Sequence, residues 1–178
     1  MRKLSMDELN RKTITEFIDA KKFPVTVILE NIRSAYNVGS VFRTADSFLI
    51  ESIIITGYTA TPPHKEIKKT ALGAEDSVQW KYIKETQEAI KYLREENYLV
   101  FAVEQASESI SLEQINFPGD QKIAFIFGNE VSGVDENTIA LCDGCIEIPQ
   151  FGVKHSLNIS VAAGIVLWEL VRKRIMNG

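Results

Sequence analysis

Residues 25–49 have the sequence VTVILENIRSAYNVGSVFRTADSFL, in which an apolar run precedes a segment with helical spacing. The run Val25–Leu29 is typical of a buried strand, because β-branched residues dominate it. The apolar residues that follow recur every three or four positions and predict an amphipathic helix. They are Val38, Val41, Phe42, Ala45, Phe48 and Leu49. A strand that leads into a helix is the repeating unit of an α/β domain.

The rest of the chain repeats this alternation. Four further apolar runs predict buried strands: Ser52–Tyr58, Tyr98–Glu104, Ile123–Phe127 and Cys145–Ile148. Thr86–Glu96 has the spacing of another helix. Strands that alternate with helices predict an α/β fold with a mainly parallel sheet flanked by helices.

Both ends of the chain carry helical patterns. Met6–Lys21 has apolar residues at helical intervals, so we expect residues 1–22 to be an N-terminal helical extension and residues 23–178 to be one domain. Leu157–Ile175 is apolar around nearly its whole circumference. Such a helix needs cover on every side, from its own domain, from a subunit interface, or from both.

Composition restricts the class of protein. The chain has 178 residues, of which 45% are hydrophobic and 25% charged, which excludes a disordered chain and fits a single folded domain. The first residues lack the apolar stretch of a secretory signal, and the longest apolar run, Val161–Val171, is interrupted by Glu169. We therefore expect a cytoplasmic protein with no membrane partner.

The two cysteines, Cys142 and Cys145, form a Cys-x-x-Cys motif. A zinc site needs about four ligands, and only His64 and His155 remain to supply the others. A redox Cys-x-x-Cys normally opens a helix after a strand, whereas this one precedes a predicted strand. We therefore expect neither a metal nor redox chemistry.

The formal net charge of −4 argues mildly against a nucleic-acid partner, but the charge is unevenly placed. Residues 104–120 and 128–147 hold acidic residues and no Lys or Arg, so the remaining chain is net basic. Either a basic face or a solvated surface with scattered charges is consistent with this distribution. Its basic residues include Arg2, Lys3, Arg11, Lys12, Arg33, Arg43, Lys65, Lys68, Lys69 and Arg172–Arg174.

The first candidate site follows the first predicted strand, where neither the dinucleotide-binding glycines nor a phosphate-binding P-loop is found. Asn37 is expected to cap the following helix. Arg43 shares the polar face of that helix with Ser40, Thr44 and Ser47. It is either a surface cation or a guanidinium that holds a phosphate or a reacting hydroxyl.

Two further candidate segments also follow predicted strands. Residues 127–134, FGNEVSGV, place two glycines around a polar pair, which suits either a backbone close to a ligand or a plain turn with Glu130 exposed. Residues 148–164, IPQFGVKHSLNISVAAG, lead into the apolar helix, which Ser156 or Asn158 is expected to cap. His155 lies in a turn and is not included among the catalytic candidates.

These three segments resemble the three motifs of the SpoU group of SPOUT methyltransferases, which methylate the ribose 2′-hydroxyl of RNA. The resemblance covers about residues 24–172. It implies catalytic or positioning roles for Asn37, Arg43, Glu130, Ser156 and Asn158. It also implies that S-adenosyl-L-methionine is bound by Val103, Glu104, Gly128, Ile148, Ser156 and Leu157.

The resemblance further implies a deep trefoil knot in the C-terminal part of the domain, a homodimer, and an RNA substrate, with tRNA favoured over ribosomal RNA. It leaves the role of Arg43 open between general base and clamp, because a guanidinium in water holds its proton. Two other hypotheses are a catalytically silent RNA-binding dimer of the same fold and a different small-molecule α/β enzyme. The latter predicts nucleotide-binding glycines after the first strand, and they are absent.

Overall fold

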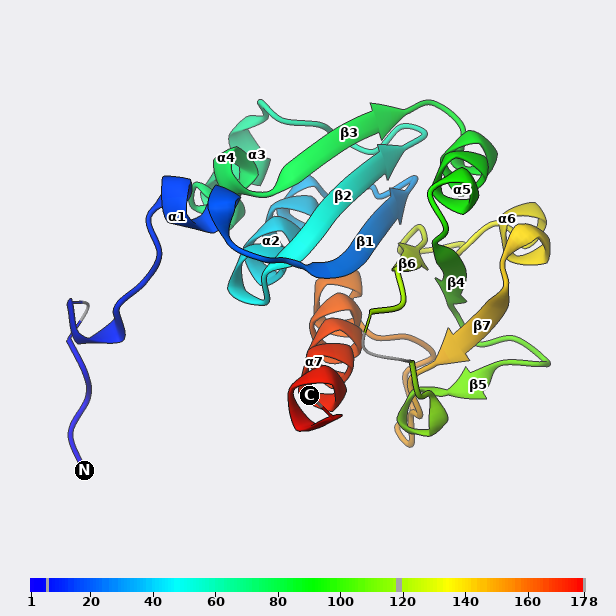
Figure 1. Ribbon diagram of the computed structural model, residues 1–178. Coiled ribbons are helices and arrows are strands. Elements are labelled where there is room, and N and C mark those ends of the chain that lie inside the picture. Colours follow the sequence, from blue (N-terminus) through cyan, green and yellow to red (C-terminus); the bar gives the residue numbers. More distant parts are fainter. Residues whose placement is uncertain (6, 118–119, 178) are drawn as a thin grey trace.

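The computed structural model of the protein describes residues 1–5, 7–117 and 120–177 and is built on one seven-stranded sheet (Figure 1). The strand order is β3-β2-β1-β6-β4-β7-β5, and neighbouring strands pair in parallel. The strands are β1 (Phe23–Glu30), β2 (Ile50–Thr56), β3 (Gln79–Ile83), β4 (Leu99–Val103), β5 (Ile110–Ser111), β6 (Ile123–Phe127) and β7 (Gly144–Glu147). Since the strands are parallel, their carboxyl ends meet at one edge of the sheet, where α/β proteins bind ligands.

Helices cover both faces of this sheet, as predicted for an α/β fold. They are α1 (Ile14–Asp19), α2 (Ala35–Ser47), α3 (Lys65–Ala71), α4 (Ala74–Ser77), α5 (Thr86–Glu95), α6 (Glu136–Leu141) and α7 (Ile159–Asn177), with short 3-10 helices at Asp7–Leu9 and Leu112–Gln114. Each face of the sheet has its own hydrophobic cluster. One packs the sheet against α2, α3 and α7, and the other packs it against α5.

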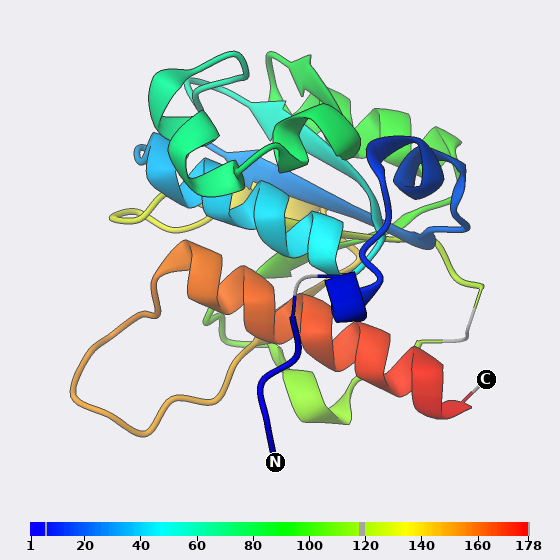
Figure 2. The same ribbon diagram turned by 90° about the vertical axis from the view of Figure 1, so that its left-hand side faces the viewer.

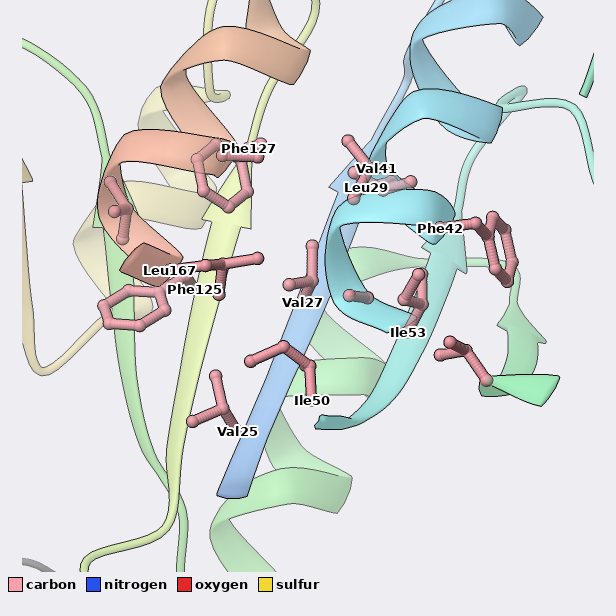
Figure 3. Close-up of a cluster of buried hydrophobic side chains, with 14 of the residues drawn as sticks. Val25, Val27, Leu29, Val41, Phe42, Ile50, Ile53, Phe125, Phe127 and Leu167 are labelled. Carbon is pink, nitrogen blue, oxygen red and sulfur yellow. The ribbon is translucent and has the colours of Figure 1, made fainter. Parts of the chain in front are cut away.

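The larger cluster lies between the sheet and the pair α2 and α7 (Figure 3). Val27 of β1, Phe42 of α2 and Leu167 of α7 are fully buried in it. On β1, Val27 and Leu29 face this cluster while Ile28 faces the other. Because both faces are covered, the strand is apolar throughout rather than alternating, which is the pattern that made it recognisable in the sequence.

The five predicted strands and the helices α2, α5 and α7 are confirmed. Two strands escaped prediction for different reasons. β3 is an edge strand whose residues are exposed or half-buried, so it lacks an apolar run. β5 has two residues and carries no periodicity.

The predicted N-terminal helix Met6–Lys21 is wrong over most of its length, and Met6 lies outside the described residues. A left-handed Asn10 (φ 44°) separates Asp7–Leu9 from α1. Thr13 and Glu16 form a capping box that starts α1. Phe17 enters the large cluster, but the other apolar side chains stay exposed because the segment extends away from the domain (Figure 1). In Figure 2 the same segment points toward the viewer and crosses in front of α7.

The long helix α7 buries one side and exposes the other. Val166, Leu167 and Leu170 are buried, whereas Val161, Ile165 and Trp168 form an exposed apolar stripe. The domain therefore covers only part of the apolar surface of α7. Within the described ranges, the structure contains no helix with the length and apolar character of a membrane span.

Candidate functional site

Three loops converge at the carboxyl edge of the sheet. They follow β1 (residues 31–34), β6 (residues 128–134) and β7 (residues 148–158). Each belongs to one of the three sequence segments singled out above. The hydrogen bonds between their side chains decide how these loops are held together.

Glu130 ties the loop after β6 to the segment after β1. Its carboxylate accepts hydrogen bonds from the backbone N–H groups of Arg33 (2.8 Å) and Ser34 (3.0 Å) and from the side-chain amide of Asn37 (2.9 Å). The alternative of an exposed Glu130 in a plain turn is therefore wrong. The carboxylate instead satisfies backbone donors ahead of α2, where negative charge is favoured.

Asn158 joins the third loop to the other two. Its side-chain amide donates to Oδ1 of Asn37 (3.1 Å), while its own Oδ1 accepts from the backbone N–H (2.9 Å) and hydroxyl (2.7 Å) of Ser160. Of the two predicted caps of α7, Ser156 and Asn158, the structure therefore shows Asn158. The predicted cap of α2 is wrong: Ser34 caps this helix, and Asn37 lies in its first turn, where its side chain can contact Glu130.

The environment of Glu130 favours its ionised form. Burial by itself raises the pKa of the carboxyl, but the hydrogen bonds from Arg33, Asn37 and Ser34 outweigh it and leave the pKa below its ordinary value. A lowered pKa in the folded protein stabilises the fold at neutral pH. That contribution is lost as the pH falls through the lowered pKa.

Glu130→Gln is expected to lower the free energy of unfolding by about 1–2 kcal/mol at pH 7, because a neutral amide cannot accept all three hydrogen bonds. The difference between wild type and variant should stay constant above about pH 5 and shrink at lower pH, as the wild-type carboxylate takes up a proton. Urea unfolding at a series of pH values measures it. The matched control is Glu95→Gln, an exposed glutamate on α5. A difference that grows on acidification would contradict the argument.

Asn129 and two glycines shape the loop 128–134. Oδ1 of Asn129 accepts from the backbone of Val131 (2.8 Å) and Ser132 (3.0 Å), and its backbone pairs with Gly133 in both directions. A Cβ on Gly128 would lie 2.2 Å from the backbone nitrogen of Val134. Gly128 is therefore required because the loop folds closely onto itself.

A pocket of about 480 Å³ lies beneath these loops. Its size falls within the usual range for small-molecule sites. All six residues that the resemblance assigns to the cofactor line it: Val103, Glu104, Gly128, Ile148, Ser156 and Leu157. Apolar side chains and loop backbone together suit a flat heteroaromatic ring, so the residues fit the expected cofactor. Their assignment as binding residues stays a prediction.

The Glu104 carboxylate has a structural contact within this pocket. It accepts from the backbone N–H groups of Gln105 (2.9 Å) and Val134 (3.2 Å), so it fixes the loop 128–134 against the end of β4. Gly133, with a φ of 71°, lies so close that a Cβ would meet this carboxylate at 2.2 Å.

Arg43 does not line the pocket. It lies on the exposed face of α2, and its guanidinium makes no hydrogen bond or ion pair with the residues that the structure describes. Asn37, Glu130 and Asn158 are brought together, and Ser156 lines the pocket beside Glu130. Arg43 is the one predicted catalytic residue that stays apart from them.

Sequence reasoning missed Glu30, the last residue of β1. It is 3% exposed and accepts from the Thr138 hydroxyl (2.6 Å) and the Asp135 backbone N–H (3.0 Å). It therefore holds the start of α6 against the sheet. The available signal was an acidic residue directly after the apolar run Val25–Leu29.

The cysteines have contacts that suit packing. Cys142 donates to the carbonyl of Thr138 (3.2 Å) and Cys145 to that of Glu104 (3.3 Å). Burial raises the pKa of both thiols, that of Cys142 to about 12, so both are protonated at neutral pH. No group of three or more metal-ligating side chains occurs among residues 1–5, 7–117 and 120–177.

The basic residues divide into two groups. Lys65, Lys68 and Lys69 are exposed on α3. Lys69 lies near the Tyr36 hydroxyl (3.4 Å). By contrast, the C-terminal basic residues are engaged within the protein.

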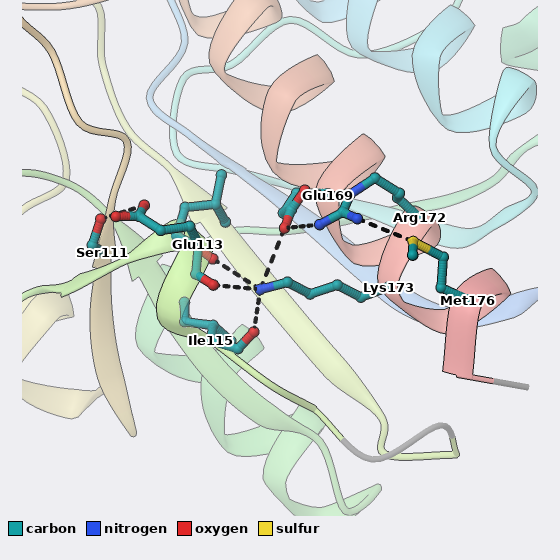
Figure 4. Close-up of polar contacts among 8 residues, drawn as sticks. Ser111, Glu113, Ile115, Glu169, Arg172, Lys173 and Met176 are labelled. Carbon is teal, nitrogen blue, oxygen red and sulfur yellow. Dashed lines mark hydrogen bonds and ion pairs between the residues drawn. The ribbon is translucent and has the colours of Figure 1, made fainter.

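The polar cluster at the end of α7 accounts for that engagement (Figure 4). Arg172 pairs with Glu169 (2.7 Å), and Lys173 pairs with the same carboxylate (3.3 Å) while it donates to the backbone carbonyls of Glu113 and Ile115. Arg174 is 8% exposed and donates to the carbonyl of Gln121. Arg172–Arg174 are among the residues considered above for a basic face, and the buried Arg174 does not contribute to one.

Known proteins match this chain over most of its length. The SpoU rRNA Methylase family model matches residues 24–168. A tRNA (guanosine(18)-2'-O)-methyltransferase of Thermus thermophilus is 31% identical over 175 residues, which cover 96% of this chain and 86% of that protein. A 23S rRNA (guanosine-2'-O-)-methyltransferase of Neisseria meningitidis is 30% identical over 86% of this chain and 60% of its own length.

Solved structures share the fold. The TrmH/SpoU tRNA modifying enzyme of A. aeolicus has a TM-score of 0.82 at 22% identity and covers 93% of this chain, which spans 82% of that one. An AdoMet-bound rRNA methyltransferase from Sinorhizobium meliloti has a TM-score of 0.78 at 26% identity, with 88% of this chain and 59% of that chain covered.

Proposed function

This chain belongs to the SpoU rRNA methylase family, and on that premise we propose that it transfers a methyl group from S-adenosylmethionine to a ribose 2′-hydroxyl of RNA. The observation that carries the proposal is the hydrogen-bonded chain Glu130–Asn37–Asn158 at the rim of the pocket. It joins the three motifs that the family's chemistry requires. The relatives named above are tRNA and rRNA 2'-O-methyltransferases, and one solved relative holds AdoMet.

The pocket residues supply binding and orientation. Val103, Ile148 and Leu157 would enclose the adenine, and backbone groups of the loops would satisfy its polar edge. The bound cofactor supplies an electrophilic methyl group. The walls of the pocket hold it in one orientation toward the rim, which reduces the entropic cost of reaching the transition state.

The ribose hydroxyl must attack that methyl carbon in line. An oxygen–carbon bond forms, a carbon–sulfur bond breaks, and the hydroxyl proton is released. We assign Arg43 to the clamp role, because its exposed, planar guanidinium suits bidentate contact with a phosphate beside the reacting oxygen. Solvent water would then take the proton.

A homodimer would explain how Arg43 reaches a pocket that it does not line. The exposed stripe Val161, Ile165 and Trp168 lies on α7, and α2, which carries Arg43, packs against this helix. We propose that a second copy covers this stripe and completes the site. The deep trefoil knot expected of the family, formed by the loops after β6 and β7, and a cytoplasmic location remain parts of the same proposal.

We favour tRNA over rRNA as the substrate. The tRNA-modifying relative from Thermus thermophilus is matched over 86% of its length, whereas the rRNA-modifying relative from Neisseria meningitidis is matched over 60%. The exposed lysines of α3 and the exposed Arg33 would contact phosphates.

Labelled methyl transfer from S-adenosylmethionine tests the function, with unmodified tRNA and ribosomal RNA offered separately. We expect label in the tRNA, located by its resistance to alkaline cleavage at the modified ribose. Label in ribosomal RNA alone would overturn the preference for tRNA. Binding of both RNA and cofactor without transfer would instead support a catalytically silent RNA-binding protein of the same fold.

A further inference from the structure

Part of the carboxyl edge of the sheet lies outside the pocket, and Tyr58 lies on that part. It lies two residues after the end of β2, and the ends of β1, β2 and β3 lie side by side there (Figure 1). Tyr58 is 63% exposed and does not line the pocket. A large aromatic side chain that stays this exposed beside a site is a candidate for contact with substrate.

The Tyr58 side chain is anchored although its ring is exposed. Its hydroxyl oxygen accepts a hydrogen bond from the side-chain amide of Asn129 (2.6 Å). The same amide nitrogen donates to the backbone carbonyl of Asn31 (2.8 Å). The ring is therefore fixed to the residue that precedes Glu130, so its position is set by the candidate site.

The backbone at Tyr58 is held equally firmly. The N–H of Tyr58 donates to Oδ1 of Asn31 (3.3 Å), and the N–H of Gly57 donates to the carbonyl of Lys84 (3.0 Å). Gly57 has a φ of 62°, and a Cβ there would lie 1.9 Å from Oδ1 of Asn31. The buried Thr59 accepts from the N–H of Ile32 (2.7 Å), which places the turn beside the exposed Arg33.

An immobilised, exposed ring on a turn that is bonded to the segment carrying Arg33 suits the recognition of unpaired nucleotides. Every nucleobase has a flat face that stacks on an aromatic ring, and guanidinium groups bind the adjoining phosphates. A ring fixed in advance loses little side-chain entropy on binding. A second exposed ring, Tyr82, donates its hydroxyl hydrogen to the carbonyl of Gly57 (2.9 Å) and continues the aromatic surface toward the sheet edge.

We propose that the Tyr58 ring stacks on an unpaired nucleobase of the RNA and thereby positions the adjoining strand at the rim of the pocket. The proposal rests on the proposed function, since it names how the same site holds its RNA. It specifies a substrate whose target region is single-stranded, because inside a duplex both faces of a base are covered by its stacked neighbours. S-adenosylmethionine binding does not involve the ring.

Tyr58→Ala tests the proposal in the full-length protein. Loss of one base stack should raise the KM for unfractionated tRNA about 5- to 150-fold, with the KM for S-adenosylmethionine changed less than about twofold. Tyr58→Phe removes the hydroxyl but keeps the ring, so it should retain RNA affinity within about threefold. Tyr92→Ala is the matched control, an exposed tyrosine on α5 away from the site.

A merely structural Tyr58 gives a different pattern. Tyr58→Phe would then be as damaging as Tyr58→Ala, and cofactor affinity would fall with it, because both variants lose the contact with Asn129. That result, or a Tyr58→Ala variant with wild-type KM for RNA, overturns the proposal. If the wild type transfers no methyl group, the proposed function fails separately. The dissociation constants of wild type and variants for tRNA, measured with S-adenosylhomocysteine present, then still decide the role of Tyr58.

Discussion

Arg43→Ala is expected to reduce methyl transfer to RNA by about 10²–10³-fold or more, the usual effect of removing a group that stabilises charge in a transition state. Cofactor affinity should be nearly unchanged, because Arg43 does not line the pocket. Single-turnover transfer and equilibrium cofactor binding measure the two effects.

The position of Arg43 makes this test unusually clean. The residue lies in the middle of α2 on its exposed face, and its guanidinium forms no hydrogen bond or ion pair within the described part of the chain. Alanine favours helices at least as strongly as arginine, so the variant should unfold at the wild-type temperature. Arg94→Ala, which removes an exposed arginine on α5 that pairs with Asp143 (2.9 Å), is the control and should transfer normally. Wild-type turnover in Arg43→Ala would remove Arg43 from the mechanism.

Arg43→Lys distinguishes a clamp from a simple positive charge. Lysine keeps the charge but lacks the planar fork that binds a phosphate or carboxylate through two parallel hydrogen bonds. If Arg43 acts as a clamp, the lysine variant should be nearly as defective as the alanine variant. Substantial recovery by lysine would show that charge alone is sufficient.

Gly128→Ala is expected to have the second largest effect, on both stability and cofactor binding. The added Cβ would lie 2.2 Å from the nitrogen of Val134 and 2.3 Å from the carbonyl carbon of Gly133. Both are backbone atoms, so the loop 128–134 has to move. Such overpacking costs about 1–3 kcal/mol in the free energy of unfolding. Cofactor affinity should fall at least about tenfold, which corresponds to about 1.4 kcal/mol, because this loop lines the pocket.

Gly152→Ala is the control for Gly128→Ala. A Cβ at Gly152 meets no atom within 4 Å, so both stability and cofactor affinity should stay at wild-type values. Urea unfolding and calorimetric titration with S-adenosylmethionine measure the two variants. Wild-type cofactor affinity in Gly128→Ala would show that the close packing of this loop is not needed for the site.

The sequence was most informative where local pattern and tertiary structure agree. β1 and β6 are apolar throughout because both faces of the sheet are covered, so they were recognisable without the structure. β3 has the half-exposed pattern of an edge strand and was missed. The N-terminal segment has helical spacing but mostly lacks a surface to pack against, so periodicity alone overestimated its helix.

The site shows the same division between local and long-range information. Asn158 was predictable as a cap because capping depends on residues adjacent in the chain. Asn37 was wrongly predicted to cap α2. Its side chain instead contacts Glu130, which lies far along the chain, and Ser34 caps the helix. The separation of Arg43 from the pocket depends on how α2 packs in three dimensions, and no local pattern reports that.

The contacts of Glu130 also bear on how the protein acquires activity during folding. They join residues 93 to 97 positions apart, and the contact between Asn158 and Asn37 spans 121 positions. Contacts of such high sequence separation incur a large loop-closure entropy and form slowly. Helices such as α5 can form early from local interactions, but the arrangement of Asn37, Glu130 and Asn158 exists only after both halves of the sheet have joined. We therefore expect an N-terminal fragment that ends before Asn158 to lack methyl-transfer activity.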